Sequence, residues 1–405
     1  MWNTGAPGWR AGLARWRGVM QRAGRAAWPA GGRRGVLGRW VGLMMLATPA
    51  GALAAELVLL QFAPLTGFDG GTGHHMQRGA ELAVAQAQAD GLLPGHRLRL
   101  LTLDERPGQV AEQLRQAQAQ TPGALVAVLG LHGRRGLAEL AHSHLLDGLN
   151  LPVVGPHTGA VGGPGLDAPW LILTRGSHAD EVEAVFRHLT TVARRRLMLA
   201  TTEDEEGREV SALVAQAAAR TGVAVSVAPP HPAGSAQVAA AVEACLQTPH
   251  DAVLLASNTS AVANFAKNYV RGGGRGQLIA LASAEAAQLS AILGSEAARG
   301  VLLSQVVPHP RDPKQGLMRE FQAAWRQFGT EGGAPSLVMV EAYIAARVAI
   351  DGLRRSPRPD GAALLRTLAA QPSPLILSGT AVVLRRQGQA WRGLSMIGQG
   401  GALLY

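Results

Sequence analysis

Residues 57–73 read LVLLQFAPLTGFDGGTG, and this stretch decides the fold class. Leu57–Ala63 is continuously apolar, as in a parallel strand that is buried on both faces. The glycine-rich loop Thr66–Gly73 follows, and apolar spacing then predicts an amphipathic helix over Met76–Ala89. A buried strand, a turn and a helix in this order are typical of α/β proteins.

The same alternation of strands and helices continues along most of the chain. The further predicted strands are Leu98–Leu103, Ala124–Leu129, Pro152–Gly155, Trp170–Thr174, Arg196–Thr202, Val223–Val227, Ala252–Ala256, Gln277–Leu281 and Gly300–Val306. The predicted helices between them are Gln109–Gln120, Gly136–Leu149, Ala179–Val192, Gly207–Thr221, Gln237–Gln247 and Ala261–Val270. The pattern restarts near Trp170, which predicts two doubly wound parallel-sheet halves.

The last hundred residues follow a different pattern. Three helices are predicted at Pro313–Phe328, Pro335–Leu353 and Asp360–Ala370, and two short strands around Thr380–Leu384 and Gly393–Ile397. A chain of 405 residues with 47% hydrophobic residues has the length and composition for two buried cores.

The positive charge lies mainly in the first 55 residues. The formal charge is +10, but residues 1–55 hold eight arginines and no acidic residue, so the remainder is nearly neutral. This distribution argues against nucleic acid as a partner.

The end of this leader is typical of a secretory signal peptide. A basic segment precedes the apolar run Val41–Ala54, which ends in Ala52-Leu53-Ala54. A membrane anchor is the alternative, but the run is shorter than the ~20 residues of a span and contains Pro49 and Gly51. We therefore expect export to the periplasm. The single cysteine, Cys245, cannot form an internal disulfide or a thiolate cluster.

Several catalytic motifs are missing from the sequence. There is no G-x-x-x-x-G-K-[ST], no G-x-S-x-G and no H-E-x-x-H, which excludes the usual phosphate loop, hydrolase elbow and zinc protease. The pairs His74-His75 and His142/His144 have no carboxylate at a diagnostic spacing, so no metal or other cofactor is predicted. Glu203–Glu206 fits either paired catalytic acids or a charged loop, and we favour the loop. No enzymatic activity is predicted.

A doubly wound sheet binds ligands in the loops at the carboxyl ends of its strands. Those loops are predicted at Thr66–Gly73, Asp104–Gly108, Gly130–Gly136, Gly155–Gly163, Arg175–His178, Thr202–Gly207, Ser257–Ser260 and Ala282–Ala286.

The order of elements and several local phrases resemble the periplasmic leucine/isoleucine/valine-binding protein family, the type I substrate-binding components of ABC importers. The phrases are Leu65-Thr66-Gly67, Arg78–Ala83, Val126–Gly130, Pro152–Pro156, Thr174-Arg175 with Ser177 and Asp180, Pro335-Ser336 and Glu341–Ala346. The resemblance implies two lobes joined by a three-segment hinge, with crossings near Arg175, Val306 and Ile376. Lobe one would hold residues 56–175 and 307–375, and lobe two residues 176–306 and 376–405.

The resemblance also implies a ligand site between the lobes. In this family the ligand carboxylate is held by the turns after the third and fourth strands, here His132-Gly133-Arg134 and His157-Thr158-Gly159. Backbone N–H groups at helix starts and a threonine hydroxyl suit an anion, although Thr158 also fits a helix cap. Arg134 and Arg135 fit either a carboxylate clamp or a solvated helix start. The remaining candidate ligand-binding residues are Thr72, Arg175, Ser177, Glu206, Asn258 and Ser283.

The sequence departs from the family at the positions that select the ligand. Ala282 or Ser283 stands where the family's amino-acid binders place an acidic residue, and Glu206, Thr72 and Asn258 stand where aromatic residues often line the cleft. These departures argue against a branched-chain amino acid and make Glu206 a candidate partner for a cationic group.

The predicted function is that of an ABC-transporter substrate-binding protein. We expect a monomer that captures a small polar solute, amino-acid-like or another carboxylate, and delivers it to an inner-membrane permease. The alternative is a periplasmic sensing module that signals to a membrane receptor. Thr158→Ala and Arg175→Ala are expected to weaken solute binding without unfolding the protein.

Overall fold

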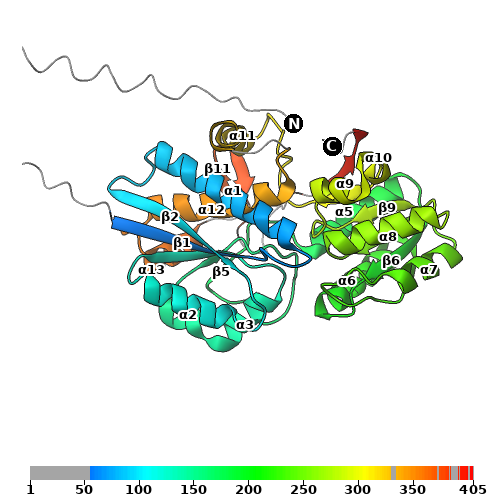
Figure 1. Ribbon diagram of the computed structural model, residues 1–405, viewed down its shortest axis with the longest axis horizontal. Coiled ribbons are helices and arrows are strands. Elements are labelled where there is room, and N and C mark those ends of the chain that lie inside the picture. Colours follow the sequence, from blue (N-terminus) through cyan, green and yellow to red (C-terminus); the bar gives the residue numbers. More distant parts are fainter. Residues whose placement is uncertain are drawn as a thin grey trace, which may run out of the picture. The chain divides into compact units, whose positions relative to one another are not determined.

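The computed structural model describes residues 55–329, 334–371, 374–382, 384, 391, 393–399 and 402–404. Apart from Ala55, the predicted leader at residues 1–55 lies outside this part of the chain. Two parallel sheets, each covered by helices on both faces, organise the described residues, as the sequence predicts (Figure 1).

The first sheet has five parallel strands in the order β2-β1-β3-β4-β5. Its strands are β1 (Ala55–Ala63), β2 (His96–Asp104), β3 (Leu125–Gly130), β4 (Val153–Val154) and β5 (Leu171–Ile172). Alternate residues of β1 enter different cores: Leu57 and Leu59 face one cluster, and Val58 and Leu60 face another. Burial on both faces therefore explains why this strand is apolar throughout.

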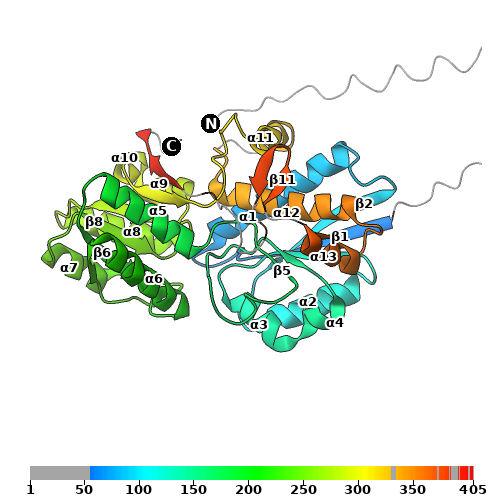
Figure 2. The same ribbon diagram turned by 180° about the vertical axis from the view of Figure 1, so that it is seen from behind.

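Two groups of helices cover the first sheet. The core that contains Leu57 is built with α1 (Gly70–Ala89), α11 (Gly316–Phe328), α12 (Leu337–Arg355) and α13 (Gly361–Ala370). The core that contains Val58 is built with α2 (Val110–Gln120), α3 (Arg135–Ser143) and α4 (Leu145–Leu149). Figure 2 shows α2 and α3 on the side of the sheet away from α1 and α12.

The second sheet has seven strands in the order β14-β13-β10-β9-β8-β6-β7. Its strands are β6 (Arg196–Thr201), β7 (Ala224–Val227), β8 (Ala252–Ala256), β9 (Gln277–Ala280), β10 (Leu302–Gln305), β13 (Gly393–Ile397) and β14 (Leu403–Leu404). Strands β6 to β10 are parallel, and β13 joins β10 in the antiparallel sense. Its helices are α5 (His178–Thr191), α6 (Glu205–Thr221), α7 (Ala239–Gln247), α8 (Thr259–Arg271), α9 (Ala286–Leu293) and α10 (Ser295–Ala298).

We call the first sheet with its helices the first lobe, and the second sheet with its helices the second lobe. The chain passes between them in three intervals, which lie between Ile172 and His178, between Gln305 and Gly316, and between Leu384 and Gly393. The prediction of a third crossing near Ile376 is wrong. The hairpin β11 (Leu375–Leu377) and β12 (Thr380–Val382) packs its apolar side chains into the core of the first lobe.

Three further differences concern local structure. Helix α1 begins at Gly70, inside the predicted loop, because its first turn lies against the Pro64–Leu65 backbone. A Cβ on Gly73 would lie 2.0 Å from the Pro64 carbonyl oxygen, so only glycine fits there. The predicted helix 136–149 is divided into α3 and α4 at His144, whose φ is 52°. Helices α9 and α10 were not predicted.

Candidate functional site

The turn after β3 and the loop after β4 are joined directly. The N–H of Gly133 donates to the carbonyl oxygen of His157 at 3.1 Å, and the N–H of His157 donates to that of Leu131 at 2.8 Å. The imidazole rings of His132 and His157 stack with their centroids 5.5 Å apart. The two turns predicted to lie together are therefore in contact at the carboxyl edge of the first sheet.

A cavity of about 210 Å³ lies between this edge and the facing edge of the second sheet. This volume is the share of roughly seven liquid water molecules at about 30 Å³ each, so it suits a small solute. Ten of the twelve predicted site residues line it: His132, Gly133, Arg134, His157, Thr158, Gly159, Arg175, Glu206, Asn258 and Ser283.

Thr72 and Ser177 do not line this cavity. Thr72 lies in the first turn of α1, only 1% exposed, and its hydroxyl accepts from Gln288 Nε2 at 3.4 Å. Ser177 caps α5: its Oγ accepts from the Asp180 N–H, and the Asp180 carboxylate accepts from the Ser177 N–H. Both positions were placed on the loop side of helix starts that the sequence located too late, or that need the side chain for capping.

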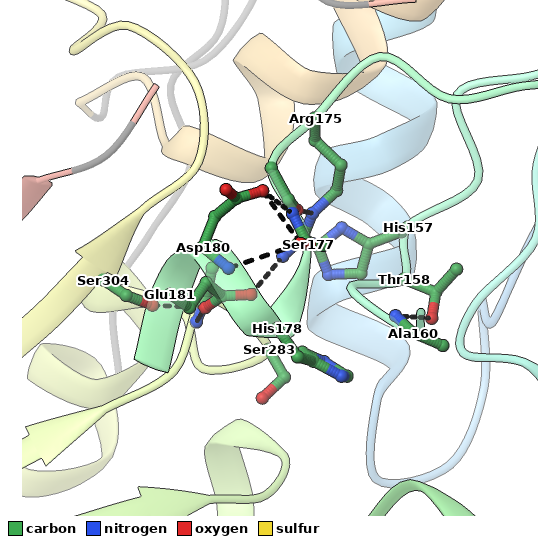
Figure 3. Close-up of polar contacts among 12 residues, drawn as sticks. His157, Thr158, Ala160, Arg175, Ser177, His178, Asp180, Glu181, Ser283 and Ser304 are labelled. Atoms are coloured by element: carbon green, nitrogen blue, oxygen red, sulfur yellow. Dashed lines mark hydrogen bonds and ion pairs between the residues drawn. The ribbon is translucent and has the colours of Figure 1, made fainter. Parts of the chain in front are cut away.

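Arg175 is held by buried carboxylates on both sides (Figure 3). Its Nη2 lies 2.8 Å from Glu181 Oε1 on α5, and its Nη1 lies 3.2 Å from Glu341 Oε2 on α12. Glu181 also accepts from the Ala282 N–H at 2.7 Å and from the Ser304 hydroxyl. Burial alone would lower the pKa of Arg175, but the two carboxylates raise it. The guanidinium thus connects the two lobes at the first crossing.

His157 belongs to the same cluster. Its Nδ1 lies 2.8 Å from Glu341 Oε2, and the side chain is 4% exposed. Burial would raise the pKa of Glu341, but Arg175 and His157 lower it, so this carboxylate is charged.

His178 lies between two carboxylates at the start of α6. Its Nε2 is 3.3 Å from Glu206 Oε1, and its Nδ1 is 3.3 Å from Glu209 Oε1. Burial alone would lower the pKa of His178, but hydrogen bonds to these two carboxylates outweigh it and raise the pKa to about 9. Burial would likewise raise the pKa of Glu206, yet His178, His132 and Arg134 lower it to about 2. His178 and Glu206 are therefore both charged at neutral pH.

Glu209 also connects the lobes. Its carboxylate accepts from the N–H groups of Val161 at 2.9 Å and Gly162 at 3.1 Å, in the first-lobe loop after β4. Arg134 Nη2, also from the first lobe, lies 3.5 Å from Glu209 Oε2 and 3.6 Å from Glu205 Oε1. Arg134 is thus paired across the cleft.

Other contacts join the lobes on the side of α1. The Ser260 hydroxyl donates to the Phe68 carbonyl oxygen at 3.3 Å, and His75 Nδ1 lies 3.5 Å from Glu285 Oε2. With the Gln288 contact to Thr72, they bring α8 and α9 against the first lobe. The lobes therefore meet on both sides of the cavity.

Thr158 does not cap a helix, because the loop after β4 forms none. Its Oγ1 accepts from the Ala160 N–H at 3.2 Å, and the side chain lines the cavity (Figure 3). The hydroxyl hydrogen is consequently available for donation into the cavity.

Sequence reasoning missed four polar residues of the lining, which are Asp69, His178, Asp204 and Ser257. All four lie in the predicted strand-end loops, so the rule for α/β sheets located the loops. It could not tell which side chains turn inward. Ser257 Oγ lies 2.8 Å from His231 Nε2, another contact between distant loops.

Within the described part of the chain, no group of three or more His, Cys, Asp or Glu residues is arranged to hold a metal ion. No helix in that part is both long and apolar enough to cross a membrane.

A family model described as "Periplasmic binding protein" matches residues 61–398. No curated protein matches the chain. Among solved structures, a substrate-binding periplasmic protein from Ralstonia solanacearum is 26% identical, with a TM-score of 0.77 over 86% of this chain and 99% of the other.

Two other similar structures have lower sequence identity. A possible leucine/isoleucine/valine-binding protein from Rhodopirellula baltica is 21% identical, with a TM-score of 0.78 over 89% of this chain and 98% of the other. A branched chain amino acid ABC transporter protein from Thermus thermophilus with bound valine is 17% identical, with a TM-score of 0.71 over 86% and 94%. At this identity the likeness concerns the fold.

Proposed function

Because the chain belongs to the periplasmic binding protein family, we propose that it captures a small polar solute between its two lobes and delivers it to an ABC permease. The solute is amino-acid-like or another compound with a carboxylate. Export to the periplasm and a monomeric state are part of this proposal.

The observation that carries the proposal is the lining of the cavity. Polar side chains from both lobes line the same space, and contacts on two sides hold the lobes together around it. A solute that touches both lobes stabilises the closed arrangement, because its contacts exist only when the lobes meet.

The size and polarity of the cavity support a solute of amino-acid size. The cavity is smaller than the 300–1,000 Å³ typical of sites for drug-sized ligands. The named proteins from Rhodopirellula baltica and Thermus thermophilus are described with branched-chain amino acids, which are in this size range.

The proposal is tested by thermal unfolding of the purified protein with a panel of amino acids, amides and small carboxylates. A solute that binds only the folded protein raises the midpoint, by an amount that grows with its concentration above Kd. We expect at least one panel member to raise it by several degrees. A panel without any stabilising member contradicts the proposal for these compounds.

Thr158→Ala is expected to weaken binding of the stabilising solute about tenfold, which corresponds to one hydrogen bond of ~1.5 kcal/mol. Calorimetric titration measures the loss. Stability without solute falls by only about 1 kcal/mol, because Thr158 makes a single bond to the Ala160 N–H. Unchanged affinity removes Thr158 from the site.

A further inference from the structure

Every paired cation around the cavity is already held by two carboxylates. The pairs are Arg175 with Glu181 and Glu341 at 2.8 and 3.2 Å, His178 with Glu206 and Glu209 at 3.3 Å each, and Arg134 with Glu205 and Glu209 at 3.6 and 3.5 Å. Five carboxylates therefore surround three cations. A solute carboxylate would have to compete with these partners for each cation.

Two aspartates increase the negative excess. Asp69 lines the cavity at the start of α1, and its side chain makes no capping bond to that helix. Asp204 also lines it; Oδ1 accepts from the Gly207 N–H at 3.0 Å and from the Thr202 hydroxyl at 2.6 Å. Arg135 is the further cation of the lining, and it is solvent-exposed. Carboxylates thus outnumber cations around the cavity.

Glu206 places one of these charges against the first lobe. Its Oε1 faces His178, whereas its Oε2 lies 3.7 Å from the position that a Cβ on Gly133 would occupy. The carboxylate therefore reaches from α6 toward the turn after β3. A negative charge stands beside the turn that the sequence assigns to a solute carboxylate.

An independent observation comes from His157, which is 5% exposed and lines the cavity. Its Nε2 is buried and has no hydrogen-bond partner within the described residues. Because the Glu341 carboxylate can only accept, Nδ1 carries the hydrogen between them, and Nε2 is the acceptor of the neutral ring. A buried acceptor without a donor is costly, so the solute is expected to supply an N–H or O–H.

We infer that the solute carries a positively charged nitrogen, an ammonium or a guanidinium, which enters the space lined by Asp69, Asp204 and Glu206 while a donor group meets Nε2 of His157. The inference rests on the proposed function and narrows its solute class. Amino acids, amines and guanidino compounds fit it. A carboxylate without a cationic nitrogen adds a fourth negative group beside three.

The test compares matched probes that differ only in charge. They are L-leucine, L-leucinamide, 2-hydroxy-4-methylpentanoate and 4-methylpentanamide, with the alanine-sized set and L-arginine alongside. We expect only probes with a cationic nitrogen to raise the unfolding midpoint of the protein. Stabilisation by the hydroxy acid, equal to or above that by the amino acid, overturns the inference and leaves the proposed function standing. If no probe stabilises the protein, the proposed function fails, and the inference with it.

Variants assign the charge to residues. Asp69→Asn and Glu206→Gln are each expected to weaken binding of the stabilising probe tenfold or more in calorimetric titration, as for the loss of a charged hydrogen bond. Glu203→Gln is the matched control, because Glu203 lies in the same loop as Glu206 but is exposed and does not line the cavity. Asp69 makes no cap, so Asp69→Asn keeps the test valid if Glu206→Gln unfolds. Wild-type affinity in both folded variants overturns the inference.

Discussion

At the scale of single residues, the charged groups of the cleft serve the structure as well as the site. The sequence indicates Arg175 as a residue that touches the solute, and it does line the cavity. Its Nη1 and Nη2, however, each face a buried carboxylate, one from each lobe. Pairings of this kind join residues far apart in the chain, which is why the sequence could not reveal them.

Arg175→Ala is now expected to destabilise the protein, contrary to the sequence-based expectation. Removing the guanidinium leaves Glu181 and Glu341 buried without their cation, a loss of about 3–5 kcal/mol. Urea denaturation measures the free energy of unfolding. Arg220→Ala, at an exposed position of α6, is the control and should change it by less than about 0.5 kcal/mol. Equal stability of the two variants would show that the cluster is not structural.

His178 predicts a dependence of stability on pH. Its pKa is raised to about 9 from 6.5, so its contribution is complete below pH 6.5 and is lost as the pH rises through 9. The lowered pKa of Glu206, about 2, makes the same pair weaken as the pH falls from 4.5 toward 2. We expect wild-type stability to fall by up to about 3 kcal/mol between pH 6.5 and 9.

His178→Asn should flatten this decline in urea denaturation at several pH values. His142→Asn, at an exposed position, should retain it. The same slope in the wild type and in His178→Asn would refute the assignment.

At the scale of elements, the close packing of α1 against α12 fixes the first lobe. A Cβ on Gly79 would lie 2.1 Å from the Met339 carbonyl oxygen and 3.0 Å from Ala342 Cβ. The sequence predicted both helices from their apolar spacing. It did not predict that α1 begins at Gly70, because the glycines there answer to contacts with Pro64 and Leu65 that local spacing does not show.

Gly79→Ala is expected to destabilise the protein by about 1–3 kcal/mol, since the added methyl group must displace the backbone of α12. Thermal and urea unfolding provide the measurement. Gly148→Ala in α4 is the matched control, as its Cβ would meet nothing within 4 Å. A Gly79→Ala protein as stable as the wild type would mean that α1 and α12 separate easily.

At the scale of the molecule, much of the fold could be predicted because parallel strands buried on both faces carry a strong apolar signal. Two crossings fall in the expected intervals, whereas the third is displaced by the β11–β12 hairpin, whose apolar residues return to the first core. For the site, the rule for strand ends located the loops, and ten predicted residues line one cavity. The pairing of Arg134, Arg175 and His178 with carboxylates depends on tertiary contacts that no local pattern encodes.

The central claim is that one solute occupies the cavity between the lobes. Calorimetric titration of the best stabilising solute into the wild type and into Ser283→Trp tests it most directly, because Ser283 lines the cavity and a tryptophan there fills it. Arg271→Trp, at an exposed position of α8, is the control. We predict one site per chain in the wild type and the control, and no binding heat in a folded Ser283→Trp. Wild-type affinity in Ser283→Trp would contradict the claim.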